Sequence, residues 1–162
     1  MWRGNSPAIG LGSRINTLAA EQGPSSPRPV VEVAVGVLLD DAGAILLGQR
    51  PVGKPYAGYW EFPGGKIESG ETLFTALSRE LQEEIDVCID DAEEFMVLEH
   101  DYPHAYVRLH ICLVRSWQGQ PRGLESQALG WLNIKNIDQL GIAGFDPVLP
   151  ATLPILEKLK RI

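Results

Sequence analysis

Short apolar runs joined by turn residues fill the part of the chain that follows residue 29. Val30 to Asp40 is rich in valine and leucine, and a second apolar run, Ala44 to Gly48, follows the turn residues Asp41-Ala42-Gly43. Two such runs around a short turn predict a β-hairpin. The next segment, Arg50 to Tyr59, holds two prolines and two glycines, so we expect a loop near a functional site.

A helix with one apolar stripe is expected to begin near Thr72. The stripe recurs at the three- and four-residue spacing of a helix face and consists of Phe74, Leu77, Leu81 and Ile85. Before the helix, Trp60-Glu61-Phe62 predicts a short strand, and Pro63-Gly64-Gly65 is expected to stop it. The predicted order is therefore strand, glycine loop and helix.

The second half of the chain continues to mix strands with a helix. Strand-like pieces lie within residues 87–98, a longer strand is predicted for 106–117, and another for 129–134. Residues 148–161 are expected to close the chain as a helix, with Pro150 near its start and Pro154 in its first turn, where a missing N–H costs little. This order predicts an α/β protein, an α/β/α sandwich around a mixed β-sheet.

The composition indicates one globular domain after a different N-terminal segment. Residues 1–29 are rich in Gly, Ser, Pro and Asn, which predicts a weakly ordered extension, and residues 30–162 form the expected domain. No apolar stretch approaches the roughly 18 residues that span a bilayer, so we expect no membrane partner. Cys88 and Cys112 are too few for a disulfide framework and are expected to be buried, which fits a cytoplasmic protein.

The charge of the chain limits its partners. A formal net charge of −7 would repel the phosphate backbone, which argues against binding of polymeric nucleic acid. If the ligand carries phosphates, cations must lie between it and the protein.

A cluster of acids on the predicted helix carries the candidate chemistry. Helical geometry places Glu80, Glu83 and Glu84 on one side, where like charges repel each other. The same geometry puts Leu77 and Leu81 beside Glu84, so the carboxylates should border the apolar stripe and line a cleft. Clustered oxygen ligands favour a hard cation such as Mg²⁺ or Mn²⁺.

Residues around this cluster could complete such a site. Gly64 and Gly65 let the backbone approach a ligand closely, and a carbonyl oxygen there could be a further metal ligand. Arg79 can reach back toward Glu71, and the ion pair would fix the preceding loop against the helix.

The segment from Gly65 to Val87 resembles the Nudix box, G-x5-E-x7-R-E-U-x-E-E-x-G-U with U aliphatic. It departs only at Asp86, where the family has glycine. That position caps the helix, and the left-handed conformation there would cost Asp about 1 kcal/mol relative to glycine. Further similarity to the MutT branch lies in Trp60 to Lys66, in the Trp117-x-Gly119-x-Pro121 turn and in the closing Lys158 to Arg161.

The resemblance implies a magnesium-dependent hydrolase that converts a nucleoside triphosphate to its monophosphate and pyrophosphate. It further implies that Glu80 and Glu84 bind Mg²⁺ together with the Gly64 carbonyl, that Glu83 shares the metals, and that Glu125 adds a carboxylate from a distant loop. Arg50 would face the nucleotide. The base pocket would be lined by Glu61, Phe62, Pro63 and Gly64, with Lys66 nearby and Phe62 as the apolar surface under the base.

The sequence leaves several alternatives open. A box glutamate or Glu125 could remove the proton from the attacking water, whereas His100, His104 and His110 are less favoured because they lack metal-ligand spacing. The substrate could be a damaged nucleotide such as 8-oxo-dGTP, a cytidine or other non-canonical nucleotide, or a dinucleotide. A third alternative is a Nudix fold that binds nucleotides without turnover. Monomer and homodimer are both compatible with the sequence.

Two departures from the MutT pattern concern the base. Thr152 stands where that pattern has an asparagine able to donate and accept together, and Ala105 stands where it has an arginine. We therefore expect weaker preference for 8-oxo-dGTP than in the MutT pattern. Thr152 could instead serve as the cap of the closing helix.

Overall fold

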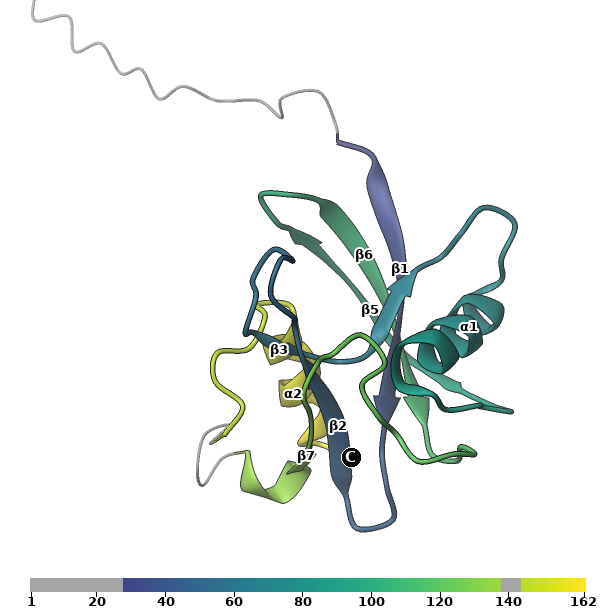
Figure 1. Cartoon of the computed structure of the whole chain (residues 1–162), viewed down its shortest axis with the longest axis vertical. Coiled ribbons are helices and arrows are strands. Elements are labelled where there is room, and N and C mark those ends of the chain that lie inside the picture. The colour runs from purple at the N-terminus through teal and green to yellow at the C-terminus, as the bar shows by residue number, and fades with distance from the viewer. Residues whose placement is uncertain (1–27, 138–143) are drawn as a thin grey trace, which may run out of the picture.

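The structure is a computed structural model that describes residues 28–137 and 144–162 (Figure 1). Almost all of the predicted N-terminal extension therefore lies outside the described residues. The seven strands are β1 (Val30–Leu38), β2 (Ala44–Gln49), β3 (Trp60–Glu61), β4 (Gly64–Lys66), β5 (Glu93–Asp101), β6 (Tyr106–Val114) and β7 (Leu129–Asn133). The helices are α1 (Leu73–Ile85), a short 3₁₀ turn (Ile134–Asn136) and α2 (Thr152–Leu159).

The strands form two sheets rather than one. The four-stranded sheet has the order β4-β1-β6-β5, in which β1 and β6 run parallel and the outer pairs run antiparallel. The second sheet, β3-β2-β7, is antiparallel. The predicted hairpin is therefore wrong in its pairing: one bridge, Leu39 to Ile45, joins the two strands at the turn, and they then enter different sheets. Long-range partners, β6 for β1 and β7 for β2, override the local pairing.

Side-chain alternation along β1 places the two helices on opposite faces of the mixed sheet. Ala34 and Leu38 belong to the same buried cluster as Leu77 and Leu81 of α1. The intervening valines, Val35 and Val37, pack in the cluster that contains residues of α2. Figure 1 shows α1 and α2 on either side of the strands. The predicted α/β class and the α/β/α layering are confirmed, with the refinement that a second sheet contributes to the middle layer.

The strand at Trp60 ends before Pro63 as predicted, but the glycines that follow form a second strand, β4, and not a loop. Gly64 and Gly65 pair with Val35 and Ala34 of β1. A side chain at residue 64 would put its Cβ 2.1 Å from the Ala34 carbonyl oxygen, so only glycine lets the strands approach this closely. The absence of two side chains thus brings the backbone of β4 next to α1.

Both ends of α1 are fixed by their capping residues. The Thr72 hydroxyl accepts a hydrogen bond from the Thr75 N–H at 3.1 Å, as expected for a helix that starts there. At the other end Asp86 has φ 60° and ψ 39°, which confirms the left-handed cap. Its carboxylate accepts a hydrogen bond from Arg122 Nε at 2.8 Å.

Two further expectations are corrected by the structure. The closing helix is shorter than residues 148–161, because the Leu149 N–H donates to the Trp60 carbonyl at 3.0 Å and holds this stretch against β3. Cys88 is exposed, while Cys112 is buried as predicted. Cys88 lies between the inward-pointing Val87 and Ile89, so the alternation of an extended segment turns it outward. Among the described residues, no helix is long and apolar enough to cross a membrane.

We predict that Asp86→Gly raises the free energy of unfolding by roughly 0.5–1 kcal/mol, because glycine adopts the left-handed conformation without a Cβ penalty. The exposed ion pair with Arg122 that is lost contributes less than this. Urea denaturation measures the change, and Arg122→Ala measures the contribution of the ion pair alone. A lower free energy of unfolding in Asp86→Gly than in the natural protein would contradict the account of this cap.

Candidate active site

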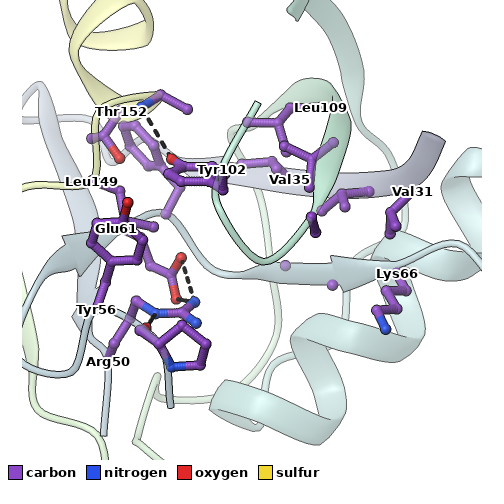
Figure 2. Close-up of a pocket in the computed structure, with 18 of the residues that line it drawn as sticks. Val31, Val35, Arg50, Tyr56, Glu61, Lys66, Tyr102, Leu109, Leu149 and Thr152 are labelled. Carbon is purple, nitrogen blue, oxygen red and sulfur yellow. Dashed lines mark hydrogen bonds and ion pairs between the residues drawn. The ribbon is translucent and has the colours of Figure 1, made fainter. Parts of the chain in front are cut away.

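A cavity of about 480 Å³ lies between the mixed sheet, the 50–59 loop and the start of α2 (Figure 2). Part of its wall is apolar and is formed by Val31, Val33, Val107, Leu109, Leu149 and Ile155. Polar and charged residues line it as well, among them Arg50, Glu61, Gly64, Lys66 and Glu84. We call the apolar part of the lining the chamber and the charged part the floor; the two adjoin where Lys66 pairs with Val33.

Glu84 of α1 is a largely buried carboxylate of that floor. Its Oε2 accepts a hydrogen bond from the Gly64 N–H at 2.9 Å, so the close approach of β4 described above fixes this side chain. The pKa of Glu84 is raised to about 8: burial is the main cause, the hydrogen bond from Gly64 opposes the shift, and the negative charges of Glu61, Glu125 and Glu80 add to it. Four carboxylates therefore lie close enough to repel each other.

Glu61 of β3 is paired with Arg50. Arg50 Nη1 lies 3.0 Å from Glu61 Oε1 and 3.2 Å from Oε2, and Arg50 Nε donates to the Pro55 carbonyl at 2.7 Å. Burial raises the pKa of the Glu61 carboxyl, while the Arg50 charge acts in the opposite direction. Arg50 therefore joins the loop to the cavity floor, and its guanidinium contacts a carboxylate.

The expected ion pair between Arg79 and Glu71 is confirmed. Arg79 Nε and Nη2 donate to the two oxygens of Glu71 at 2.8 and 2.7 Å, in the two-pronged geometry that suits a guanidinium. These hydrogen bonds lower the pKa of Glu71 to about 2. Arg79 also donates to the Lys66 carbonyl at 3.0 Å, so one side chain fixes the loop between β4 and α1.

Arg79 also contacts the acidic stripe, which the sequence did not predict. Its Nη1 lies 2.9 Å from Glu80 Oε1 and 3.3 Å from Glu83 Oε2. Glu80 is mostly buried, but the Glu83 side chain is 60% exposed, so only part of the stripe borders the core as expected. Glu83 lies toward solvent because Leu77 and Leu81 place the apolar face of α1 away from it.

Glu125 approaches the same floor from the loop between β6 and β7. The Leu124 N–H and the Gln127 side-chain amide both donate to the Glu84 carbonyl at 3.0 Å, which ties this loop to the end of α1. The Glu125 carboxylate lies 3.3 Å from Lys54 Nζ. A residue 41 positions after Glu84 is thus brought beside it by hydrogen bonds to the helix backbone.

The donor set suits a hard cation, because the acidic groups of the floor are carboxylates, which supply oxygen ligands. Within residues 28–137 and 144–162, no three acidic, histidine or cysteine side chains are grouped tightly enough to hold a metal ion. The partners explain this: Arg79 binds Glu80 and Glu83, Lys54 binds Glu125, and the Gly64 N–H binds Glu84. A divalent cation would compete with these partners for the same oxygens.

The remaining predicted substrate residues lie around the cavity in different ways. Phe62 is 5% exposed and packs in the core while also lining the cavity, so core packing and the expected place under the base are compatible at this position. Pro63 lines a smaller pocket that also includes Glu84 and Glu125. Thr152 lines the cavity and is the first residue of α2, so it does lie in the first turn of the closing helix, but the cap is Ala151 and no side chain caps this end.

Sequence reasoning missed several residues that line the cavity, among them Lys54, Tyr56 and Tyr102. The density of proline and glycine in residues 50–59 predicted the loop that holds Lys54 and Tyr56, but it did not predict that these two side chains line the cavity. Tyr102 carried no local signal. The histidines lie in two places: His110 pairs with Glu32 at 2.6 Å, whereas His100 and His104 both pack on the Tyr102 ring, and His104 also lines the cavity.

A sequence profile described as the NUDIX domain matches residues 30–151, three quarters of the chain. The chain belongs to the Nudix family. It is 35% identical to an Escherichia coli 8-oxo-dGTP diphosphatase over 82% of this chain and 98% of that enzyme. It is 34% identical to an E. coli CTP pyrophosphohydrolase over 79% of this chain and 90% of that enzyme.

A solved structure supports the same assignment. The MutT NUDIX hydrolase from Burkholderia pseudomallei matches with a TM-score of 0.69 and 28% identity, over 80% of this chain and 98% of that one. This Nudix chain is therefore a MutT-like hydrolase that acts on phosphoanhydride bonds. Members of the family generally require a divalent metal, which agrees with the donor set of the cavity floor.

We predict that Gly65→Ala lowers kcat/KM of this Nudix hydrolase by about 100-fold, because a displacement of a reacting group by about 1 Å has this effect. A Cβ at residue 65 would lie 2.3 Å from the Glu80 carboxyl carbon and would displace that carboxylate. Gly43→Ala, in the turn before β2, is the control because it strains the backbone with no atom of the site nearby. Unchanged kcat/KM in a folded Gly65→Ala protein would show that the position of Glu80 is unimportant.

Proposed function

We propose that this chain is a Mg²⁺-dependent nucleoside triphosphate pyrophosphohydrolase in which Mn²⁺ can substitute, and that residues 30–162 form its catalytic domain. It converts a nucleoside triphosphate and water to the monophosphate and pyrophosphate, and damaged nucleotides such as 8-oxo-dGTP are its substrates. The observation that carries the proposal is that Glu84 lies within electrostatic reach of Glu61, Glu125 and Glu80, and that Glu84 and Glu61 line a cavity with a large apolar part. A nucleotide matches this lining, because its base can occupy the apolar chamber while its triphosphate, a polyanion, lies at the floor through bound cations.

The acidic floor would hold the metal through Glu80, Glu83, Glu84, Glu125 and the Gly64 carbonyl. When bound, Mg²⁺ would neutralise charge on the triphosphate and lower the pKa of a water molecule. The Arg79 and Glu71 pair keeps α1 and the preceding loop in place, which positions the ligands of this helix. A carboxylate of the box or Glu125 accepts the proton of the attacking water.

The polar residues around the phosphate end have separate roles in the proposal. Arg50 and Lys66 supply positive charge toward the nucleotide, and Glu61 orients Arg50 through two close contacts. Phe62, Pro63 and Gly64 line the path between the base chamber and the floor. The protein acts mainly by positioning and charge stabilisation, as phosphoryl transfer requires.

A second candidate substrate class is cytidine nucleotides. The CTP pyrophosphohydrolase relative is nearly as similar to this chain as the 8-oxo-dGTP diphosphatase is. Thr152 and Ala105, both at the cavity, leave the base without the amide and guanidinium of the MutT pattern. A non-catalytic nucleotide-binding module is disfavoured because Glu80, Glu83 and Glu84 are all present.

We predict that turnover requires a divalent cation and releases pyrophosphate. Phosphorus NMR of the products with Mg²⁺ and with EDTA tests both points, because orthophosphate and pyrophosphate give separate signals. Glu84→Gln is expected to lower turnover by several orders of magnitude, because it removes a proposed metal ligand, while thermal stability of the metal-free protein stays unchanged or rises slightly, because burial already disfavours the charged form of this carboxyl. Turnover without metal, or release of single phosphate, would refute the proposed reaction.

We also predict that preference for 8-oxo-dGTP over dGTP is weaker here than in the MutT pattern and that Thr152→Asn strengthens it. Asparagine supplies a donor and an acceptor at the cavity wall, whereas threonine supplies one hydroxyl. The measurement is kcat/KM for both nucleotides on both proteins, with Thr152→Ala as the control for loss of the hydroxyl. Strong discrimination by the natural protein that persists in Thr152→Ala would place recognition of the oxidised base elsewhere.

A further inference from the structure

Tyr102 places a phenol hydroxyl in the wall of the base chamber. It lies in the turn between β5 and β6, is 5% exposed and lines the cavity. Its oxygen accepts a hydrogen bond from the Ala151 N–H at 3.2 Å, the dashed contact between Tyr102 and the start of α2 in Figure 2. The hydroxyl is therefore held at the point where the β5–β6 turn meets the C-terminal helix.

This contact uses the oxygen of Tyr102 as an acceptor and leaves its proton free to be donated. Among the described residues, no group accepts a hydrogen bond from this hydroxyl. Burial raises the pKa of Tyr102, so the hydroxyl keeps its proton at neutral pH. A protonated, unsatisfied donor at the wall of an apolar chamber is stabilised by a ligand that brings an acceptor.

The ring of Tyr102 is fixed by neighbouring aromatic rings. Its centroid lies 5.5 Å from that of Tyr56, 5.4 Å from that of His104 and 4.2 Å from that of His100. With rings around it and a hydrogen bond at its oxygen, the side chain has little freedom to move away from a mismatched ligand. Its donor is thus preorganised, which is the condition for discrimination between ligands.

The surroundings of the hydroxyl indicate what it meets. Valine, leucine and isoleucine side chains form most of the apolar end of the cavity. Thr152 lies one residue after the Ala151 N–H, and its hydroxyl makes no hydrogen bond within the described part of the chain. Tyr102 and Thr152 therefore place two hydroxyl groups beside the cavity near the start of α2, where a ligand in the chamber can contact them.

We propose that Tyr102 is a specificity-determining residue that donates a hydrogen bond to a carbonyl oxygen on the edge of the substrate base. The inference rests on the proposed function, because it assumes that the apolar chamber holds the base. It selects 6-oxopurines over adenine, which bears an amino group in place of the carbonyl. An amino group at this edge leaves the Tyr102 donor unpaired and sets a second donor against it.

The test compares Tyr102→Phe with Tyr59→Phe, which removes the hydroxyl of another tyrosine in the same aromatic cluster. Calorimetry measures the Kd of 2′-deoxyinosine monophosphate and 2′-deoxyadenosine monophosphate, two ligands that differ at the C6 substituent. We expect the natural protein to bind the inosine ligand more tightly. Tyr102→Phe should weaken inosine binding by about 3- to 10-fold and leave adenosine binding nearly unchanged, and Tyr59→Phe should change neither.

An unchanged ratio of the two Kd values in Tyr102→Phe would overturn the inference. If both ligands bind equally more weakly, the contact with Ala151 is only structural; if neither changes, the hydroxyl does not contact the base. The ratio of kcat/KM for the two triphosphates gives a second readout of the same preference. Absence of triphosphate turnover in the natural protein would refute the proposed function instead, while the binding of monophosphates would still decide the role of Tyr102.

Discussion

The contact between the Gly64 N–H and the Glu84 carboxylate is the constraint on which the site depends. It requires β4 to lie close to two elements: a side chain at residue 64 would collide with the β1 backbone at Ala34, and one at residue 65 would collide with the Glu80 carboxylate of α1. It also holds a carboxylate where burial and three neighbouring acids disfavour its charge. The fold therefore keeps an electrostatically unfavourable cluster in place through backbone geometry, and a cation is the partner that such a cluster favours.

Cationic side chains already balance part of this cluster. Arg79, Arg50 and Lys54 each bind one or more of its acids, and the first two also donate to backbone carbonyls. Arg79 and Arg50 are thereby fixed to the scaffold, while Lys54 pairs with Glu125 at an exposed position. This difference suits two roles: the arginines hold the loops in place, and the lysine can leave Glu125 when a cation binds to the floor.

The local features of the site could be predicted from the sequence, and the long-range features could not. The start of α1 at Thr72, the left-handed Asp86 and the Arg79 and Glu71 pair all depend on residues within one helix and its adjoining loop. The hairpin failed because strand pairing depends on distant partners. Gly64 and Gly65 were predicted to form a turn. Glycine indicates that another part of the chain comes close, but the sequence does not show which part; in the structure it is β1.

The base chamber was the least predictable part of the site. Tyr102 reaches it from the β5–β6 turn and Thr152 from the start of α2, and only the packing of these segments makes them neighbours. The acidic floor, in contrast, takes Glu80 and Glu84 from one short motif, to which Glu61 and Glu125 are added by other segments. The motif is thus encoded locally in this chain, while the rest of the cavity is assembled from segments far apart in sequence.

The central claim, that the acidic floor is strained without a cation, is tested most directly by thermal unfolding of the protein with Mg²⁺ and with Na⁺ at matched ionic strength. The account predicts that Mg²⁺ at about a hundredfold excess over its Kd raises Tm by roughly 5 °C or more, because it binds the folded cluster and relieves its repulsion. The same Tm in both salts would contradict the account, since the carboxylates would then be stable with their protein partners alone.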